Sequence, residues 1–245
     1  MSETHAVQRL YQARMQRVTR PYLARGANVV RCKLCMINAH LCICAHRPSI
    51  KSQAAFMLVM YDDEVLKPSN TGRLIADVAS DCHAYIWSRT EPEQAMLDTI
   101  NDPKYQAFVV FPGEYAASER VVSQPEVPLG KIPLFILLDA SWSQARKMFK
   151  KSPWLAHLPV LSFAPDLVSR YLIRKSVQDH QLATAEVAAL VYDSINEPKN
   201  GALMNAWFDV FKEHYLTGKM QRQLPEQGAL QRLALLQGNN AADIA

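Results

Sequence analysis

Runs of apolar residues, separated by turn-forming residues, divide the chain into alternating predicted strands and helices. The clearest is the run LFILL at 134–138, which is much too short to span a membrane and is flanked by turn residues. A continuous apolar run of this length is typical of a strand buried on both faces of a parallel sheet. Similar runs predict further strands at 54–61, 83–87, 107–111 and 160–163.

Helical spacing of apolar residues follows most of these runs. After the run at 134–138, Trp142, Ala145 and Met148 recur on one side of a predicted helix, and Ser141 with Gln144 has the spacing of a capping box. Strands that alternate with helices indicate an α/β fold, with a mainly parallel sheet and helices on both faces. Other helices are predicted at 6–18, 74–79, 91–100, 182–195, 202–216 and 230–236.

An acidic residue, Asp139, ends the central apolar run and stands just before the predicted helix. In open α/β sheets, ligands bind at the carboxyl ends of the strands, beside helix N-termini. Asp139 followed by a basic helix therefore suggests chemistry on an anionic substrate. The alternative is an ordinary acidic helix cap.

Two other predicted strand ends have residues suited to a ligand. Asn70, Thr71 and Gly72 follow the first strand at the start of a helix, whose free backbone N–H groups suit a carboxylate or phosphate. The alternative is an ordinary polar turn. Phe111 and Pro112 close the third predicted strand, which is another end open to a ligand.

Four of the five cysteines lie close together, with the spacing C-x2-C, six residues, C-x-C. Four thiolates satisfy a tetrahedral zinc ion in a structural site, and a short polar segment needs such a staple to fold. A disulfide pair or a chance cluster is the alternative, and the lone Cys82 is interpreted as a small buried residue. The predicted zinc ligands are Cys32, Cys35, Cys42 and Cys44.

Positive charge is concentrated near the N-terminus, although the net charge of the 245 residues is only +4. The first 51 residues contain nine Lys or Arg residues and one acidic residue, Glu3. This asymmetry points to a polyanion such as nucleic acid, and a solvated helix face is the alternative. We predict a basic helical arm and zinc module at 1–51, a catalytic domain at 52–217 and a helical tail at 218–245.

Several classes of protein find no support in the sequence. The first residues are polar and charged, which excludes a signal peptide, so a reducing cytoplasm is expected. No G-x-x-x-x-G-K-[ST] or G-x-G-x-x-G motif for nucleotides occurs. H-E-x-x-H and G-x-S-x-G are also missing, which weakens a hydrolase interpretation.

Six motifs occur in order over most of residues 31–192: the cysteine cluster, Glu64 with 67–74, 110–112, 139–142 with 145–148, 171–174 and 184–186. Each motif is weak alone, but their order is specific. Together they resemble the DTW-domain family of tRNA-uridine aminocarboxypropyltransferases, especially bacterial members that modify a uridine in the tRNA variable loop. The family's Asp-Gly-Thr-Trp signature reads Asp139-Ala140-Ser141-Trp142 here, and its usual serine before Thr184 is Ala183.

The resemblance implies a SPOUT-like fold whose knotted C-terminal half holds S-adenosylmethionine. Family members transfer its 3-amino-3-carboxypropyl group to N3 of uridine and release 5′-methylthioadenosine. Asp139 is then the candidate catalytic base. The implied cofactor-binding residues are Asn70, Thr71, Gly72, Phe111, Pro112, Ser141, Trp142, Thr184 and Glu186. The implied RNA-binding residues are Arg14, Arg17, Arg73, Lys147, Lys150 and Arg174.

Some alternatives stay open at this point. Trp142 could be a core residue rather than a ligand-stacking one, and the basic segment 170–175 could be a half-buried strand rather than an RNA contact. The protein could also be a SPOUT-type RNA methyltransferase, a ribosomal RNA aminocarboxypropyltransferase or a non-catalytic zinc-containing RNA-binding protein. We expect a monomer that binds tRNA and S-adenosylmethionine and has no membrane partner.

Overall fold

The computed structural model describes residues 4–18, 28–164 and 182–242. Its centre is a six-stranded sheet in the order β2-β1-β5-β3-β6-β4, and every strand pairing in it is parallel. The predicted α/β class with a mainly parallel sheet is thus confirmed. The strands are β1 (Ala55–Met60), β2 (Cys82–Ile86), β3 (Tyr105–Val110), β4 (Val121–Val122), β5 (Ile132–Asp139) and β6 (Val160–Leu161).

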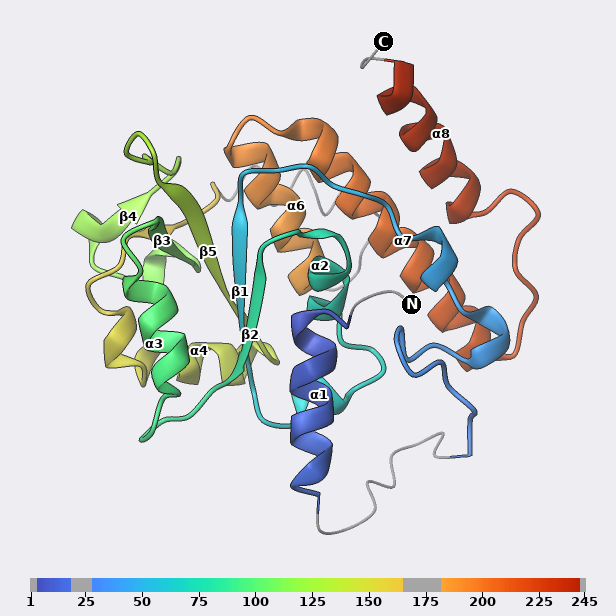
Figure 1. The fold of residues 1–245 in the computed structure, drawn as a ribbon, viewed down its shortest axis with the longest axis horizontal. Coiled ribbons are helices and arrows are strands. Elements are labelled where there is room, and N and C mark those ends of the chain that lie inside the picture. Colours follow the sequence, from blue (N-terminus) through green and yellow to red (C-terminus); the bar gives the residue numbers. More distant parts are fainter. Residues whose placement is uncertain (1–3, 19–27, 165–181, 243–245) are drawn as a thin grey trace.

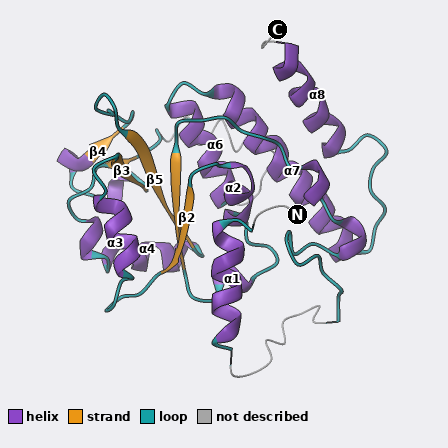
Figure 2. Cartoon of the chain, in the orientation of Figure 1, coloured by secondary structure: helices purple, strands orange, loops and turns teal. Residues whose placement is uncertain are grey.

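Helices enclose the sheet from both sides (Figures 1 and 2). The predicted helices all occur, with ends that differ by several residues. The short edge strand β4 was not predicted, because two residues carry no readable periodicity. The helices are α1 (Ala6–Gln16), α2 (Gly72–Val78), α3 (Gln94–Asn101), α4 (Trp142–Lys150), α6 (Thr184–Ser194), α7 (Pro198–Met220) and α8 (Ala229–Ala242).

The sheet separates two hydrophobic cores. Phe56, Leu58 and Met60 of β1 face a core shared with α2, α6 and α7, whereas the alternate residues Met57 and Val59 face α3 and α4. All six residues of β1 are buried, and the interior of β5 is buried as well. Burial on both faces explains why these strands read as continuous apolar runs rather than as alternating ones.

The neighbouring strands β1 and β5 are followed by connections that lead to opposite faces of the sheet. Met60 is in register with Asp139. The connection after β1 leads to α2 on one face of the sheet, and the connection after β5 leads to α4 on the other face (Figure 1). Such a switch point leaves room for a ligand between the two connections.

The N-terminal elements pack on the same side as α2 and α7. His5, at the N-cap of α1, and Arg47, after the cysteine cluster, both pair with the buried carboxylate of Asp77 in α2. The indole of Trp207 in α7 donates to the same carboxylate at 3.3 Å. One buried acid therefore joins α1, the cysteine segment and α7 to α2.

The knotted, SPOUT-like path and the division into three domains stay predictions. The connection from β6 to α6 runs through 165–181, which lies outside the described residues, as does the predicted RNA contact at Arg174. Among the helices that are described, none is both long enough and apolar enough to cross a bilayer.

Candidate active site

The carboxylate of Asp139 joins three segments that are far apart in the sequence. It is the last residue of β5 and only 3% exposed. Its Oδ2 accepts a hydrogen bond from Asn70 Nδ2 at 2.6 Å, and its Oδ1 accepts one from Thr184 Oγ1 at 2.6 Å. The structure therefore brings together three of the predicted site residues at the switch point of the sheet.

Gly72 lies against this carboxylate so closely that no side chain fits. A Cβ atom placed on Gly72 would lie 3.0 Å from Asp139 Cγ and would collide with Asp139 Oδ2. Asn70 uses its other side-chain atom, Oδ1, to accept from the backbone N–H of Arg73 at 3.1 Å, which caps the start of α2. The loop after β1 is thus fitted to Asp139 by its shape and by its hydrogen bonds.

The start of α6 is tied to the same loop. The backbone N–H of Ala185 donates a hydrogen bond to Thr71 Oγ1 at 3.4 Å. Ala183 is the N-cap residue of α6. Ala183 N donates to Glu186 Oε2 at 2.8 Å, with Glu186 only 4% exposed. Glu186 therefore caps the first turn of α6, a position in which a carboxylate is also favoured by the helix dipole.

Burial raises the pKa of Asp139 to about 6. The hydrogen bonds from Thr184 and Asn70 act in the opposite direction, while the charge of Glu64 raises this pKa and that of Arg73 lowers it. A carboxylate with such a pKa is still mostly ionised at neutral pH, yet it accepts a proton more readily than an exposed aspartate. Asp139 is thus suited to proton transfer.

Arg73 is buried beneath the site and not on the surface. It is only 3% exposed, and its guanidinium donates to the backbone carbonyls of Lys67 at 3.2 Å and Val65 at 3.4 Å. Burial lowers the pKa of this guanidinium. The predicted RNA contact at Arg73 is therefore corrected: RNA cannot reach this side chain, which instead holds the loop before α2.

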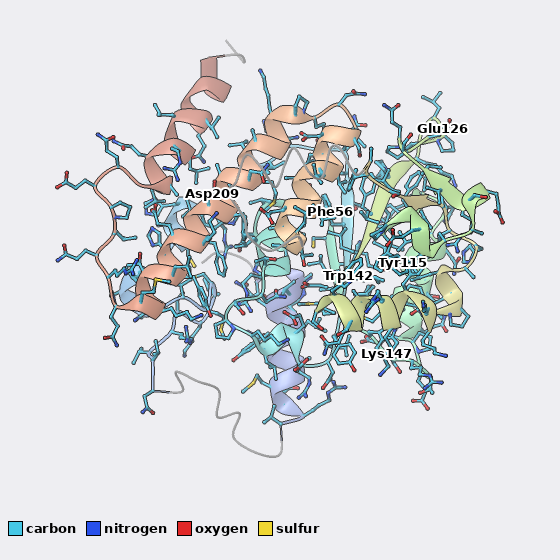
Figure 3. All side chains as sticks on the ribbon, turned by 180° about the vertical axis from the view of Figure 1, so that it is seen from behind. Phe56, Tyr115, Glu126, Trp142, Lys147 and Asp209 are labelled. Atoms are coloured by element: carbon cyan, nitrogen blue, oxygen red, sulfur yellow. The ribbon has the colours of Figure 1, made fainter. Side chains whose placement is uncertain are left out.

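A cluster of aromatic rings lies on the other side of Asp139. Phe111, at the end of β3, stacks on Phe149 with ring centroids 4.5 Å apart and on Trp142 at 5.6 Å. Tyr115 meets Trp142, the first residue of α4, edge to face at 5.8 Å, and Figure 3 labels both residues. Trp142 thus packs in the manner of a half-buried core residue, and the neighbouring Pro112 is exposed.

The signature segment keeps its expected turn despite its substitutions. Ser141 is the N-cap of α4, and its backbone N–H donates to Gln144 Oε1 at 3.1 Å, as the spacing predicts. Ala140 stands where the family signature has glycine. Ala140 is not among the described non-glycine residues that have a left-handed backbone conformation, so an alanine at this position causes no strain. Those residues are Met36, Asn196 and Gln221.

The other predicted RNA-binding residues lie in two places. Arg14 forms a two-pronged ion pair with Asp62, at 2.9 and 2.7 Å, and Arg17 reaches the same carboxylate at 3.3 Å. The side chain of Arg14 is 18% exposed and that of Arg17 is 63% exposed. Lys147 and Lys150 are exposed on α4. Of the predicted RNA-binding residues that the structure describes, Arg17, Lys147 and Lys150 are thus the ones open to a large ligand.

The four clustered cysteines have the spacing that a zinc ion requires. Their Sγ atoms all lie within 4.8 Å of one another, and the measured pairs are 3.4, 3.7 and 3.9 Å apart. Four sulfurs around a zinc ion at about 2.3 Å are separated by about 3.8 Å. Disulfide-bonded sulfurs would be only about 2.05 Å apart, and all four cysteines are free.

The pKa of Cys35 is lowered to about 5, mainly because Cys44 donates a hydrogen bond to its sulfur. The same interaction with Cys35 raises the pKa of Cys44, and burial raises that of Cys42. A thiolate at Cys35 is the form of the side chain that binds a divalent metal, and metal binding releases the protons of the thiols that it also takes as ligands.

Comparison with known proteins places these two sites in one family. A family model described as "DTW domain" matches residues 29–216. A protein named tRNA-uridine aminocarboxypropyltransferase 2, from Macaca fascicularis, is 26% identical over 176 residues, which is 69% of this chain and 57% of the relative. The chain thus spans little more than half of that relative. No solved structure matches. Because the family match encloses both the cysteine cluster and the Asp139 site, the chain belongs to the DTW-domain family.

Proposed function

We propose that this protein transfers the 3-amino-3-carboxypropyl group of S-adenosylmethionine to N3 of a uridine in tRNA, releasing 5′-methylthioadenosine. The observation that supports this most is the buried carboxylate of Asp139, held by Asn70 and Thr184 at the switch point of the sheet. The name of the relative from Macaca fascicularis points to the same reaction.

The residues around Asp139 suit such a donor. Two helix N-termini converge there, since α4 begins at Trp142 and α6 begins at Thr184, which donates to Asp139. Free backbone N–H groups in the first turn of a helix bind carboxylates. The donor would supply an electrophilic carbon beside its sulfonium, so that a bond forms from that carbon to N3 while the carbon–sulfur bond breaks and sulfur keeps the electron pair.

Asp139 would take the proton that N3 must lose. Each of its oxygens accepts one hydrogen bond in the structure, and a carboxylate oxygen can accept a second. Thr184 and Asn70 would hold the carboxylate so that its free lone pairs keep one direction. Such fixed orientation, rather than a difference in chemical reactivity, would select the longer arm of the donor over its methyl group.

The test is incubation with S-adenosylmethionine and unmodified tRNA, followed by mass analysis of the nucleosides. The Asp139→Asn variant should lose transfer by at least a hundredfold and keep its affinity for tRNA. Full activity in this variant would remove Asp139 from the role of base. A methylated nucleoside would instead support an RNA methyltransferase, and modification of ribosomal RNA alone would support that substrate. No product and no donor binding by calorimetry would leave a non-catalytic RNA-binding protein.

We further propose that Cys32, Cys35, Cys42 and Cys44 bind a structural zinc ion. Three of the six sulfur–sulfur distances, 3.4 to 3.9 Å, support this, because they are near the spacing of a tetrahedral four-sulfur site, and all six are within 4.8 Å. The segment is attached to the body of the protein through His214 Nδ1, 2.9 Å from the carbonyl of Leu41. Zinc would thereby help to fix the N-terminal part of the chain against α7.

A further inference from the structure

Two aromatic residues that the sequence did not single out form a stacked pair at the carboxyl edge of the sheet. Tyr61 directly follows β1, and Trp87 directly follows the neighbouring strand β2. Their ring centroids are 5.7 Å apart with an interplanar angle of 21°. Both residues are only partly buried, so part of the pair is open to a ligand.

The pair is held firmly in place. Trp87 N donates to the carbonyl of Met60 at 2.8 Å, which continues the pairing of β2 with β1. The indole Nε1 donates to the hydroxyl of Ser152 at 2.9 Å, and Ser152 is only 3% exposed. Tyr61 N donates to the carbonyl of Asp139 at 3.0 Å. The rings are therefore pre-oriented and joined through the backbone to the candidate active site.

A positive charge stands over the pair. Lys147 Nζ lies 6.0 Å from the ring centroid of Tyr61 and 5.9 Å from that of Trp87. Both distances are at the outer limit of a cation–π contact, so the exposed ammonium group is not committed to the rings. Figure 3 shows Lys147 on the outer side of α4, away from Trp142 and Tyr115.

The charges around the pair favour a polyanion. Of the three acidic residues that follow Tyr61, Asp62 pairs with Arg14 and Arg17, and Glu64 pairs with Lys67. Asp63 forms no ion pair with a described residue. The basic side chains of α4 and its C-cap are all exposed, and none forms an ion pair with a residue of the described ranges. These side chains are Arg146, Lys147, Lys150 and Lys151.

We propose that Tyr61 and Trp87 form a stacking platform for an unpaired nucleobase of the RNA substrate, whose phosphate is bound by Lys147. This inference rests on the proposed function, because it takes RNA as the substrate. A uridine that is modified at N3 must leave its stack, and a neighbouring base then loses its stacking partner. A fixed aromatic pair beside a basic helix replaces that partner without selecting a base type.

The experiment measures binding of fluorescently labelled, unmodified tRNA by anisotropy, without any donor present. Trp87→Leu removes the aromatic face and should weaken binding about tenfold. Trp87→Phe keeps an aromatic face and should restore most of the affinity. Ser152→Ala removes the hydrogen-bond partner of the indole N–H but leaves both rings, so it should weaken binding less than Trp87→Leu does. Thermal melting of each variant measures any general loss of folding.

Lys147→Gln tests the same proposal if Trp87→Leu fails to fold. Lys147 is exposed on α4, so its replacement should not affect folding. This variant should weaken binding several-fold and lower the slope of log affinity against log salt by about one. Short-wavelength crosslinking of tRNA to the wild-type protein should yield modified peptides that contain Tyr61 or Trp87.

Wild-type affinity in both Trp87→Leu and Lys147→Gln would overturn the platform, and so would crosslinks at other segments alone. These results are separate from the fate of the proposed reaction, because no donor is present. If aminocarboxypropyl transfer is detected but the variants bind normally, only the platform fails. If transfer is not detected but the variants bind weakly, the platform stands and the proposed reaction fails.

Discussion

The closest fit in the molecule, between Gly72 and Asp139, gives the sharpest prediction. Replacing Gly72 with alanine adds one methyl group, which would lie 3.0 Å from Asp139 Cγ and collide with Asp139 Oδ2. Neither partner has room to move, because Gly72 opens α2 within a buried turn and Asp139 is held by Asn70 and Thr184. The added methyl group must therefore break at least one of these hydrogen bonds or shift the turn.

The expected cost follows from these contacts. Overpacking a well-filled site typically destabilises a protein by about 1–3 kcal/mol, and a lost hydrogen bond to a charged group contributes about 1.5–3 kcal/mol. The site will relax in whichever of these two ways costs less, so we expect the free energy of unfolding to fall by about 2 kcal/mol. For a chain of this size that lowers the Tm by about 4–8 °C. Transfer activity should fall much further, because the carboxylate loses its orientation.

Thermal melting and the transfer assay check this prediction together. Gly238→Ala in α8 is the matched control, because a Cβ there meets no atom within 4 Å. This control should melt at or slightly above the wild-type temperature, since alanine favours a helix over glycine. In the double variant Gly72→Ala with Asp139→Ala the collision is gone, so the two changes should cost less than their sum. Wild-type melting and activity in Gly72→Ala would refute the close packing of this glycine on Asp139.

Three further predictions concern the charge of Asp139, the cysteine cluster and the N-terminal helix. Folding raises the pKa of Asp139 from 3.8 to about 6. The stability that this group contributes is therefore fully present below pH 3.8 and is lost as the pH rises through 6. Melting curves should show the stability of Asp139→Asn increasing relative to that of the wild type from about pH 4 to about pH 7. The transfer rate should in turn rise with an inflection near pH 6, and a flat profile would exclude Asp139 as the base. Cys35→Ser should lose bound zinc, measured by emission spectroscopy, and lower the Tm by several degrees, whereas unchanged metal content would contradict the zinc site. Arg17→Glu should raise the KM for tRNA several-fold at low salt, and an unchanged KM would show that this exposed arginine is only solvated.

The sequence revealed the central strand and its acidic end because both have a local signature. A run of apolar residues that stops at a carboxylate reads as a buried strand with a functional end, and Asp139 lies at that place in β5. The cysteine spacing is equally local, and the four sulfurs do cluster. The capping pair Ser141 and Gln144 is also found where its spacing predicts a helix start. In each case the residues that form the feature are near one another along the chain.

Features that depend on strand order could not be predicted in this way. Trp87 meets Tyr61 because β2 pairs with β1, and Thr184 reaches Asp139 because α6 packs against β5. No periodicity in the sequence encodes either contact. Arg73 misled the prediction for a different reason. Charged residues are rarely buried unless partners are available, and its partners are backbone carbonyls, which have no sequence signature.

The position of β1 explains why the candidate active site and the proposed stacking platform lie together. β1 pairs with β5 on one side and with β2 on the other. Tyr61, the next residue, therefore donates its backbone N–H to the carbonyl of Asp139 while its ring stacks on Trp87. A base that stacks on this pair is thus positioned relative to Asp139 through a single residue and one backbone hydrogen bond. Because parallel strands fix this register, RNA binding and proton transfer would share one rigid edge of the sheet.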